Sequence, residues 1–493
     1  MATLLKKEYD AIVVGSGPNG LAAAITLQQQ GLSVLLLEGS KTIGGGLRTA
    51  ELTLPGFRHD ICSAIQPLAV NSAFFNSLPL QNFGLKYIYP AIDAAHPFDN
   101  GSAAFLKQSI EETAAALGKD EKTYSHLAKG LTARWPELVK DLLGPLQLTR
   151  HPISMAAFGC KALQPATWYS RHFKSAAGKS LWAGMAAHSM LPLSYTATSA
   201  IALVLMMSAH ARGWPVCEGG SQSLADALAL FFTSLGGKIE TGRFIKSFSQ
   251  LPSAKAILFD CNPRQLLQIA GHRFSWLYKK QLSRFRYGMG VFKIDWALDA
   301  PAPFIAPECR LAGTVHLGGD YKEIVNTEWQ TWKGYHPEKP FVLFAQQSLL
   351  DSSRAPAGKH TAWAYCHVPN GSRVDRTAAI ENQVERFAPG FKERILARHT
   401  LNTEQLEEYN PNYAGGDIIG GRITVGQLFT RPALRRSPYR SSARGIYICS
   451  ASTAPGAGVH GMCGYHAARR ALKDIFKIDL ASGGGLDTSR IHF

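Results

Sequence analysis

The stretch at residues 9–38 reads YDAIVVGSGPNGLAAAITLQQQGLSVLLLE. Tyr9–Val14 is a short apolar run, which predicts a buried parallel strand. Residues 21–30 are rich in alanine and leucine and predict a helix, and residues 33–37 predict a second apolar strand that Glu38 closes. A strand, a glycine turn, a helix and a second strand within about thirty residues have the order and size of one βαβ unit. The stretch therefore predicts the first unit of an α/β fold.

The turn between the first strand and the helix is Gly15-Ser16-Gly17-Pro18-Asn19-Gly20, a G-x-G-x-x-G motif. Gly15 allows the tight turn, Gly17 lets the backbone approach a pyrophosphate, and Gly20 lets the helix pack closely on the strand. The helix N-terminus would bind the phosphates, and Glu38 would accept hydrogen bonds from ribose hydroxyls. A glycine turn without a ligand is the alternative, but the flanking elements and the acidic residue favour a dinucleotide site.

A second glycine segment follows the second strand and reads Ile43-Gly44-Gly45-Gly46-Leu47-Arg48. Its glycines allow a second close approach to the ligand, and Arg48 can pair with a phosphate or stack along the cofactor. A simple NAD dehydrogenase needs no such extension, so the segment favours FAD. The predicted contacts from this part of the chain are Gly39, Gly45, Gly46, Leu47 and Arg48.

A third glycine segment lies near the C-terminus, where residues 456–461 read GAGVHG after a predicted strand at 445–450. Few residues remain for a second βαβ unit, so we interpret the segment as a helix N-terminus aimed at a flavin ring, whose reduced form it would stabilise. The predicted contacts are Ser452, Gly458, Val459, His460 and Met462. His460 could shuttle a proton. The alternative is a structural imidazole that hydrogen-bonds to nearby backbone.

The rest of the chain predicts two kinds of structure. Residues 91–212 read as mainly helical, whereas the alternating apolar segments from about residue 286 predict an antiparallel sheet. Further predictions are helices at 224–235 and about 461–475, and strands at 238–240 and 256–260. The predicted fold class is α/β, with a Rossmann-type unit that binds FAD.

Several segments together resemble one family. They are LPGFRHD at 54–60, GGS at 219–221, APAGKHT at 355–361, YAGGDI at 413–418 and GVHGMCGY at 458–465. The chain is similar to the phytoene desaturase-like branch of the FAD-dependent amine oxidase superfamily. Within that branch it resembles the pyridine nucleotide-disulfide oxidoreductase domain-containing protein 2 group.

The resemblance implies an α/β fold with a discontinuous Rossmann-type FAD-binding domain and an inserted α+β substrate domain. The FAD-binding domain would comprise residues 1–90, 213–275 and 425–480, and the substrate domain residues 91–212 and 276–424. Residues 481–493 would form a loose tail. The resemblance also implies a backbone contact to adenine at Ile245.

The resemblance implies an oxidoreductase that is phytoene dehydrogenase-like. Flavin N5 would accept a hydride from a hydrophobic substrate, isoprenoid, polyene-like or lipid-like, and leave a new double bond. Two alternatives remain: a flavin-dependent isomerase of a polyene, and a flavin-loaded interaction protein with little turnover. No metal site and no catalytic acid or base other than His460 are predicted.

Charge and cysteine content suggest the surroundings of the protein. The net charge is +16, with basic clusters at residues 279–286 and 431–444 but no run of five basic residues. An anionic membrane surface or an anionic ligand fits this pattern better than a nucleic acid, and a solvated surface without a partner is the alternative. The eight cysteines form no C-x-x-C pair, which favours a reducing, cytoplasmic location. The basic clusters add the expectation of peripheral contact with an anionic membrane. The apolar run at 197–207 is too short to span a bilayer and predicts a buried helix or a monotopic contact.

Overall fold

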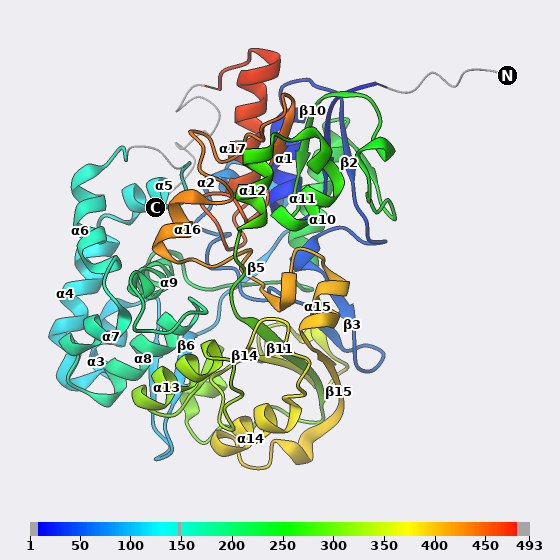
Figure 1. Cartoon of the computed structure of the whole chain (residues 1–493). Coiled ribbons are helices and arrows are strands. Elements are labelled where there is room, and N and C mark those ends of the chain that lie inside the picture. The colour runs from blue at the N-terminus through cyan, green and yellow to red at the C-terminus, as the bar shows by residue number, and fades with distance from the viewer. Residues whose placement is uncertain (1–7, 146–148, 481–493) are drawn as a thin grey trace.

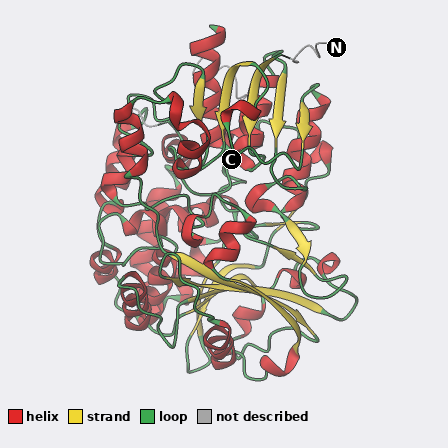
Figure 2. Cartoon of the chain, turned by 45° about the vertical axis from the view of Figure 1, so that its right-hand side comes forward, coloured by secondary structure: helices red, strands yellow, loops and turns green. Residues whose placement is uncertain are grey.

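The structure is a computed structural model that describes residues 8–145 and 149–480. Two β-sheets organise it, one at each end of the molecule, with helices packed around them (Figures 1 and 2). The predicted tail at 481–493 lies outside the described residues.

The first sheet is entirely parallel and is built from distant parts of the chain. Its strand order is β16-β10-β1-β2-β9. The bounds are β1 (Tyr9–Val14), β2 (Val34–Leu37), β9 (Lys238–Glu240), β10 (Ala254–Phe259) and β16 (Ile446–Ile448). Side chains of β1 alternate between two apolar layers, because Ala11 and Val13 face one cluster while Ile12 and Val14 face another. A sheet with both faces covered needs such continuous apolar strands, so the α/β prediction is confirmed.

Helices cover both faces of this parallel sheet. α1 (Pro18–Gln28), α10 (Gln222–Ser234) and α17 (Met462–Ala471) pack on one face, and α11 (Pro263–Ala270) and α12 (Trp276–Ser283) on the other. α1 begins three residues earlier than predicted, because Pro18 occupies its first turn, where a proline needs no N–H partner.

The second sheet lies in the other half of the molecule. Its strand order is β15-β11-β14-β13-β12-β6-β7, and every pair is antiparallel except β12 with β6. The bounds are β6 (Ile92–Pro97), β7 (Ala103–Leu106), β11 (Gly290–Leu298), β12 (Ala312–Leu317), β13 (Val342–Ala345), β14 (His360–Val368) and β15 (Ile395–Leu401).

The hairpin of β6 and β7 corrects the prediction of a mainly helical segment from residue 91 onward. The sequence of β6, IDAAHP, has a single β-branched residue and no strand signal of its own. It becomes a strand because it pairs with β12, which lies more than 200 residues later in the chain. The helical prediction holds from residue 110 onward, where seven helices follow: α3 (Ile110–Ala116), α4 (Glu121–Thr132), α5 (Trp135–Leu142), α6 (Pro152–Ala162), α7 (Ala166–Tyr169), α8 (Ala176–Ala187) and α9 (Thr198–Arg212).

Helix α9 contains residues 198–207 of the apolar run, and Ala197 caps it; none of residues 197–207 is exposed. The buried-helix prediction is therefore correct, and this segment offers no apolar face to a membrane. No helix among residues 8–145 and 149–480 is long and apolar enough to cross a bilayer.

The remaining helices are α2 (Ala73–Asn76), α13 (Tyr321–Trp332), α14 (Thr377–Phe387), α15 (Thr403–Tyr409) and α16 (Val425–Thr430). The short strands are β3 (Thr49–Glu51), β4 (Arg58–Asp60), β5 (Tyr87–Ile88) and β8 (Val216–Cys217).

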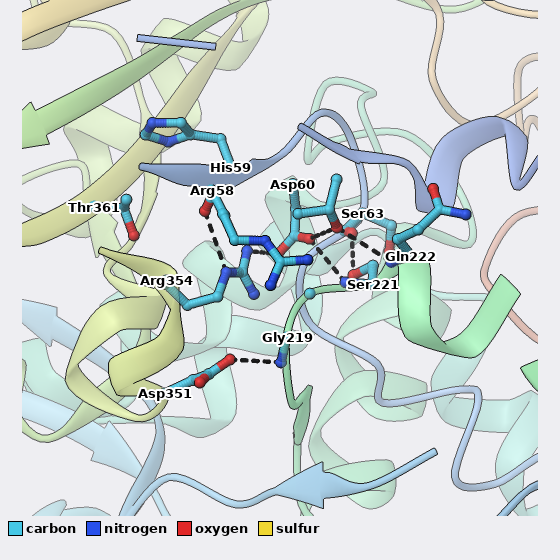
Figure 3. Close-up of polar contacts among 12 residues, drawn as sticks. Arg58, His59, Asp60, Ser63, Gly219, Ser221, Gln222, Asp351, Arg354 and Thr361 are labelled. Carbon is cyan, nitrogen blue, oxygen red and sulfur yellow. Dashed lines mark hydrogen bonds and ion pairs between the residues drawn. The ribbon is translucent and has the colours of Figure 1, made fainter. Parts of the chain in front are cut away.

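A buried ion pair ties the two halves together (Figure 3). Asp60 ends β4, and Arg354 ends the short 3-10 turn before β14; their Oδ2 and Nη2 atoms lie 2.6 Å apart and both side chains have no exposed surface. The other carboxylate oxygen of Asp60 accepts hydrogen bonds from Thr49 Oγ1 at 2.6 Å and from the Ser221 N–H at 2.8 Å. Ser221 in turn donates to the Ser63 carbonyl at 2.6 Å, so the pair fixes the segment that begins at Cys62.

Candidate functional site

A cavity of about 640 Å³ lies between the two halves. Loops at the carboxyl ends of β1, β2 and β10 form one part of its wall, which is where open parallel sheets bind their ligands. The other part comes from the second sheet and from the helical segment. Of the predicted cofactor contacts, those that line the cavity are Gly15, Ser16, Gly17, Pro18, Asn19, Glu38, Gly39, Gly45, Gly46, Arg48, Ile245, Ser452, Gly458 and Val459.

Two glycine loops meet at the start of α1. An added Cβ on Gly20 would lie 2.0 Å from the carbonyl oxygen of Gly15, so only glycine fits there. Gly45 of the second loop packs on Gly17, where a Cβ would lie 3.0 Å from its Cα. The helix N-terminus and its positive dipole end are thereby left accessible to a phosphate group.

Asp260 is a site residue that the sequence analysis missed. It follows β10, lies in the same cradle, and its Oδ2 accepts a hydrogen bond from the Gly20 N–H at 3.0 Å. Burial raises the pKa of the Asp260 carboxyl to about 7, and the nearby charge of Glu38 adds to the rise. The sequence did contain a signal for Asp260, because an acidic residue stands at the end of a predicted strand there, as Glu38 does at the end of the second strand.

Glu38 and Arg48 form one buried unit rather than two separate contacts. The Glu38 carboxylate accepts hydrogen bonds from the Ser16 N–H at 2.9 Å, from Ser16 Oγ at 2.5 Å and from the Ser40 N–H at 2.8 Å. Arg48 Nη2 lies 3.2 Å from it, and the guanidinium carbon stands 5.0 Å from the centre of the Tyr409 ring. The sequence did not predict the contact between Arg48 and Tyr409, because the two residues lie some 360 residues apart in the chain.

Four predicted contacts lie behind the cavity wall: Gly20, Leu47, His460 and Met462. The imidazole of His460 is fully buried, and its Nδ1 accepts a hydrogen bond from the Met462 N–H at 3.0 Å. Burial lowers the pKa of His460 to about 4, so the ring is neutral. The Ser72 hydroxyl donates to the His460 carbonyl at 2.6 Å, so this residue braces the turn before α17.

The far part of the cavity is apolar and aromatic, and we call it the substrate chamber. Leu205 and Trp214 form one wall, and Thr314, Leu343, Trp363 and Tyr365 project from the second sheet. The rings of Trp363 and Tyr365 are stacked with centroids 5.5 Å apart. His188, at the end of α8, completes the chamber.

The residues present fit a dinucleotide that continues toward a flavin. The glycine cradle leaves no room for side chains, Glu38 stands at the end of β2, and the loop that leads into α17 reaches the same cavity. The buried Asn19 Oδ1 has no hydrogen-bond partner among the described residues, which leaves an acceptor in the cradle. The part of the cavity beside the glycine loops is continuous with the substrate chamber, where a reacting group of the cofactor would meet a substrate.

Comparisons with known proteins agree with this geometry. Residues 13–74 match the family model of an NAD(P)-binding Rossmann-like domain. The chain is 26% identical to mouse pyridine nucleotide-disulfide oxidoreductase domain-containing protein 2, over 96% of this chain and 94% of that protein. It is 24% identical to the neurosporene-forming phytoene desaturase of Rhodobacter capsulatus, over 92% of each chain.

Among solved structures, cyclohexylamine oxidase from Brevibacterium oxydans has a similar fold. Its TM-score is 0.60 at 15% identity, and the match covers 96% of this chain and 99% of that one. This structure shows the shared fold. The sequence similarities confirm the predicted resemblance to the phytoene desaturase-like branch of the FAD-dependent amine oxidase superfamily, and with it FAD as the cofactor.

Proposed function

We propose that this chain, an FAD-dependent oxidoreductase, removes two hydrogens from a neutral, hydrophobic substrate and leaves a new double bond. FAD, when bound, supplies the hydride acceptor at its N5 position. The chain's own residues would bind the dinucleotide, orient the substrate and exclude water.

The observation that carries the proposal is the distribution of charge along the cavity. The charged side chains in its lining are Glu38, Arg48, Arg243, Asp260 and Glu408, and all belong to the dinucleotide loops or to α15 beside them. None of the described residues that line the substrate chamber is charged. On the same face of the second sheet, Lys293 and Asp295 form a buried ion pair with each other and do not line the chamber. An apolar, uncharged chamber favours an isoprenoid, polyene-like or lipid-like substrate over an ionised one.

Anaerobic mixing tests the proposal. The FAD-loaded protein is combined with a panel of neutral apolar compounds, and bleaching of the flavin absorbance is followed. Bleaching with a product two hydrogens lighter supports dehydrogenation, whereas an unchanged product mass would indicate isomerisation. A flavin that no compound of the panel reduces would contradict the proposed reaction. Protein that takes up no FAD would contradict the cofactor assignment itself.

We further propose that the protein docks on an anionic membrane through α12 and the loop after α16. Trp276 and Leu277 of α12 are 68% and 57% exposed, and Leu434 of the loop is 71% exposed. Arg435 stands 5.3 Å from the centre of the Tyr278 ring, so the basic clusters at 279–286 and 431–444 meet on one surface. Part of the second cluster does not face outward, because Arg431 is buried.

A pocket beside this surface supports an anionic partner. Arg284, Arg286 and Arg422 line it together, and no carboxylate of the described residues forms an ion pair with them. The Arg422 guanidinium is held over the Trp332 ring, 4.6 Å from its centre. Burial, followed by the charge of Arg286, lowers the pKa of Arg422. A lipid phosphate would relieve this repulsion.

Vesicle flotation tests the docking surface. Binding to vesicles with anionic lipid should exceed binding to neutral vesicles and fall as salt rises, because each nearby basic residue contributes about 1 kcal/mol. Some vesicle binding should persist at high salt, and the double variant Trp276→Ser with Leu434→Ser should weaken that salt-resistant binding. Ile153→Ser, at a residue that is 77% exposed on α6, is the matched control. Protein that stays off anionic vesicles at low salt would overturn this proposal and leave the reaction untouched.

A further inference from the structure

Two histidines meet at the wall of the substrate chamber. His188 caps α8 and His316 lies on β12, and their Nε2 atoms are 3.0 Å apart. His316 is fully buried, whereas His188 keeps some accessible surface and lines the cavity. Burial, with a smaller effect of His367, lowers the pKa of His188 to about 3. Its accessible surface therefore faces the enclosed chamber and not bulk water, and its ring is neutral.

The contact between the two rings fixes where their protons lie. Two imidazole nitrogens can form a hydrogen bond only if one of them carries the proton. Nδ1 of His316 is buried, has no partner among the described residues, and packs against Gly184, where a Cβ would lie 2.7 Å away. A buried N–H group without an acceptor is rarer, and costs more free energy, than a buried acceptor atom without a donor. His316 therefore carries its proton on Nε2 and donates a hydrogen bond from this atom to Nε2 of His188.

His188 is then left with its proton on Nδ1. That atom has no hydrogen-bond partner in the described part of the chain, and it is not among the buried atoms sealed from solvent. Thr314, two residues before His316, projects from the same face of β12 and lines the cavity. Its hydroxyl is buried without a described partner. Polar atoms left unpaired in an apolar chamber indicate a ligand atom that would pair with them.

We infer that His188 presents an Nδ1–H donor to the substrate, and that the chamber selects a neutral apolar molecule carrying a hydroxyl, ether or carbonyl oxygen rather than a pure hydrocarbon. The inference rests on the proposed function for the position of the substrate. It adds the chemical class and assigns His188 a role in specificity.

Matched probes test the inference by binding alone. The probes are geranylgeraniol, its methyl ether, and the hydrocarbon in which hydrogen replaces the hydroxyl group. Affinity for the FAD-loaded protein is read from tryptophan fluorescence, because Trp214 and Trp363 line the chamber. His188→Leu should weaken the alcohol and the ether about five-fold relative to the hydrocarbon, as expected for the loss of one neutral hydrogen bond. His188→Asn, whose amide can donate from a similar position, should restore part of the difference.

Leu205→Val is the control, because it alters the chamber wall without removing a donor and should affect all three probes alike. The wild-type protein gives a test that needs no variant. The ether accepts but cannot donate, so a bound alcohol with an unbound ether would overturn the assignment of a donor. An unchanged ratio of affinities in His188→Leu, or no binding of the alcohol at all, would also overturn the inference. If His188→Leu changes the ratio of probe affinities but no compound of the panel bleaches the flavin, only the proposed reaction would be contradicted.

Discussion

Replacement of Arg354 by methionine tests how firmly the two halves are joined. The guanidinium of Arg354 and the carboxylate of Asp60 are both fully buried. Arg354→Met keeps most of the side-chain volume but leaves the Asp60 carboxylate without its counter-charge. Two hydrogen bonds, from Thr49 and from Ser221, would then be its support. Breaking a buried pair from one side costs about 3–5 kcal/mol, a large part of the 5–15 kcal/mol that stabilises a typical domain.

Urea unfolding of the FAD-free and FAD-loaded protein measures this effect. Lys359→Met is the matched control, because Lys359 pairs with Asp299 at the surface, where both side chains are largely exposed. Such a pair contributes about 0–1 kcal/mol. The double variant Arg354→Met with Asp60→Asn should recover part of the loss, since no charge remains buried. The segment that starts at Cys62 lines the cavity, so Arg354→Met should also retain less FAD. An Arg354→Met variant no less stable than Lys359→Met would refute the reasoning.

Three further predictions concern the cofactor half. Asp260 has a pKa raised to about 7, so the folded chain holds a proton there between pH of about 4 and 7 that the unfolded chain releases. The stability of the FAD-free protein should therefore fall as pH rises through this window, and Asp260→Asn should remove that part of the dependence in urea titrations at several pH values. Glu38→Ala should weaken FAD binding by about 1.5–3 kcal/mol in a flavin fluorescence titration, and an unchanged affinity would exclude a role in binding. Gly464→Ala would place a Cβ 1.7 Å from the Asn19 carbonyl oxygen, so α17 must move away from α1 at a cost of about 1–3 kcal/mol or more. Gly130→Ala, in the open on α4, should instead stabilise by about 0.5–1 kcal/mol, and equal melting temperatures for the two variants would contradict this packing argument.

The two strands of the first βαβ unit could be predicted to within one residue because their apolar runs are local, whereas the helix begins three residues earlier than predicted. β1 agrees with the prediction at both ends, and β2 differs by one residue. A buried parallel strand needs an uninterrupted apolar run, and Gly20 is required by its contact with Gly15 in the same unit. Gly15 and Gly17 pack instead against Asp260, so only part of the physical reason for this turn lies in the local sequence.

Other features depend on partners that lie far away in the chain. β6 forms only because β12 pairs with it, and Arg48 is oriented by Tyr409 as well as by Glu38. The substrate chamber combines His188 from a helix with Trp363 from the second sheet. No spacing in the sequence indicates that such residues meet, so the sequence could not predict the histidine pair.

The strand order of the parallel sheet has a consequence for synthesis on the ribosome. β1 is made first, but the helix that covers α1 begins at Met462, and Gly464 of that helix packs on Asn19. At the usual 5–20 residues per second, roughly 450 residues and about 20–90 s separate the emergence of these two contacts. During that time the apolar surface of α1 lacks its final cover. Exposed apolar surface on a nascent chain is prone to aggregation, and the cofactor unit can close only after α17 has emerged.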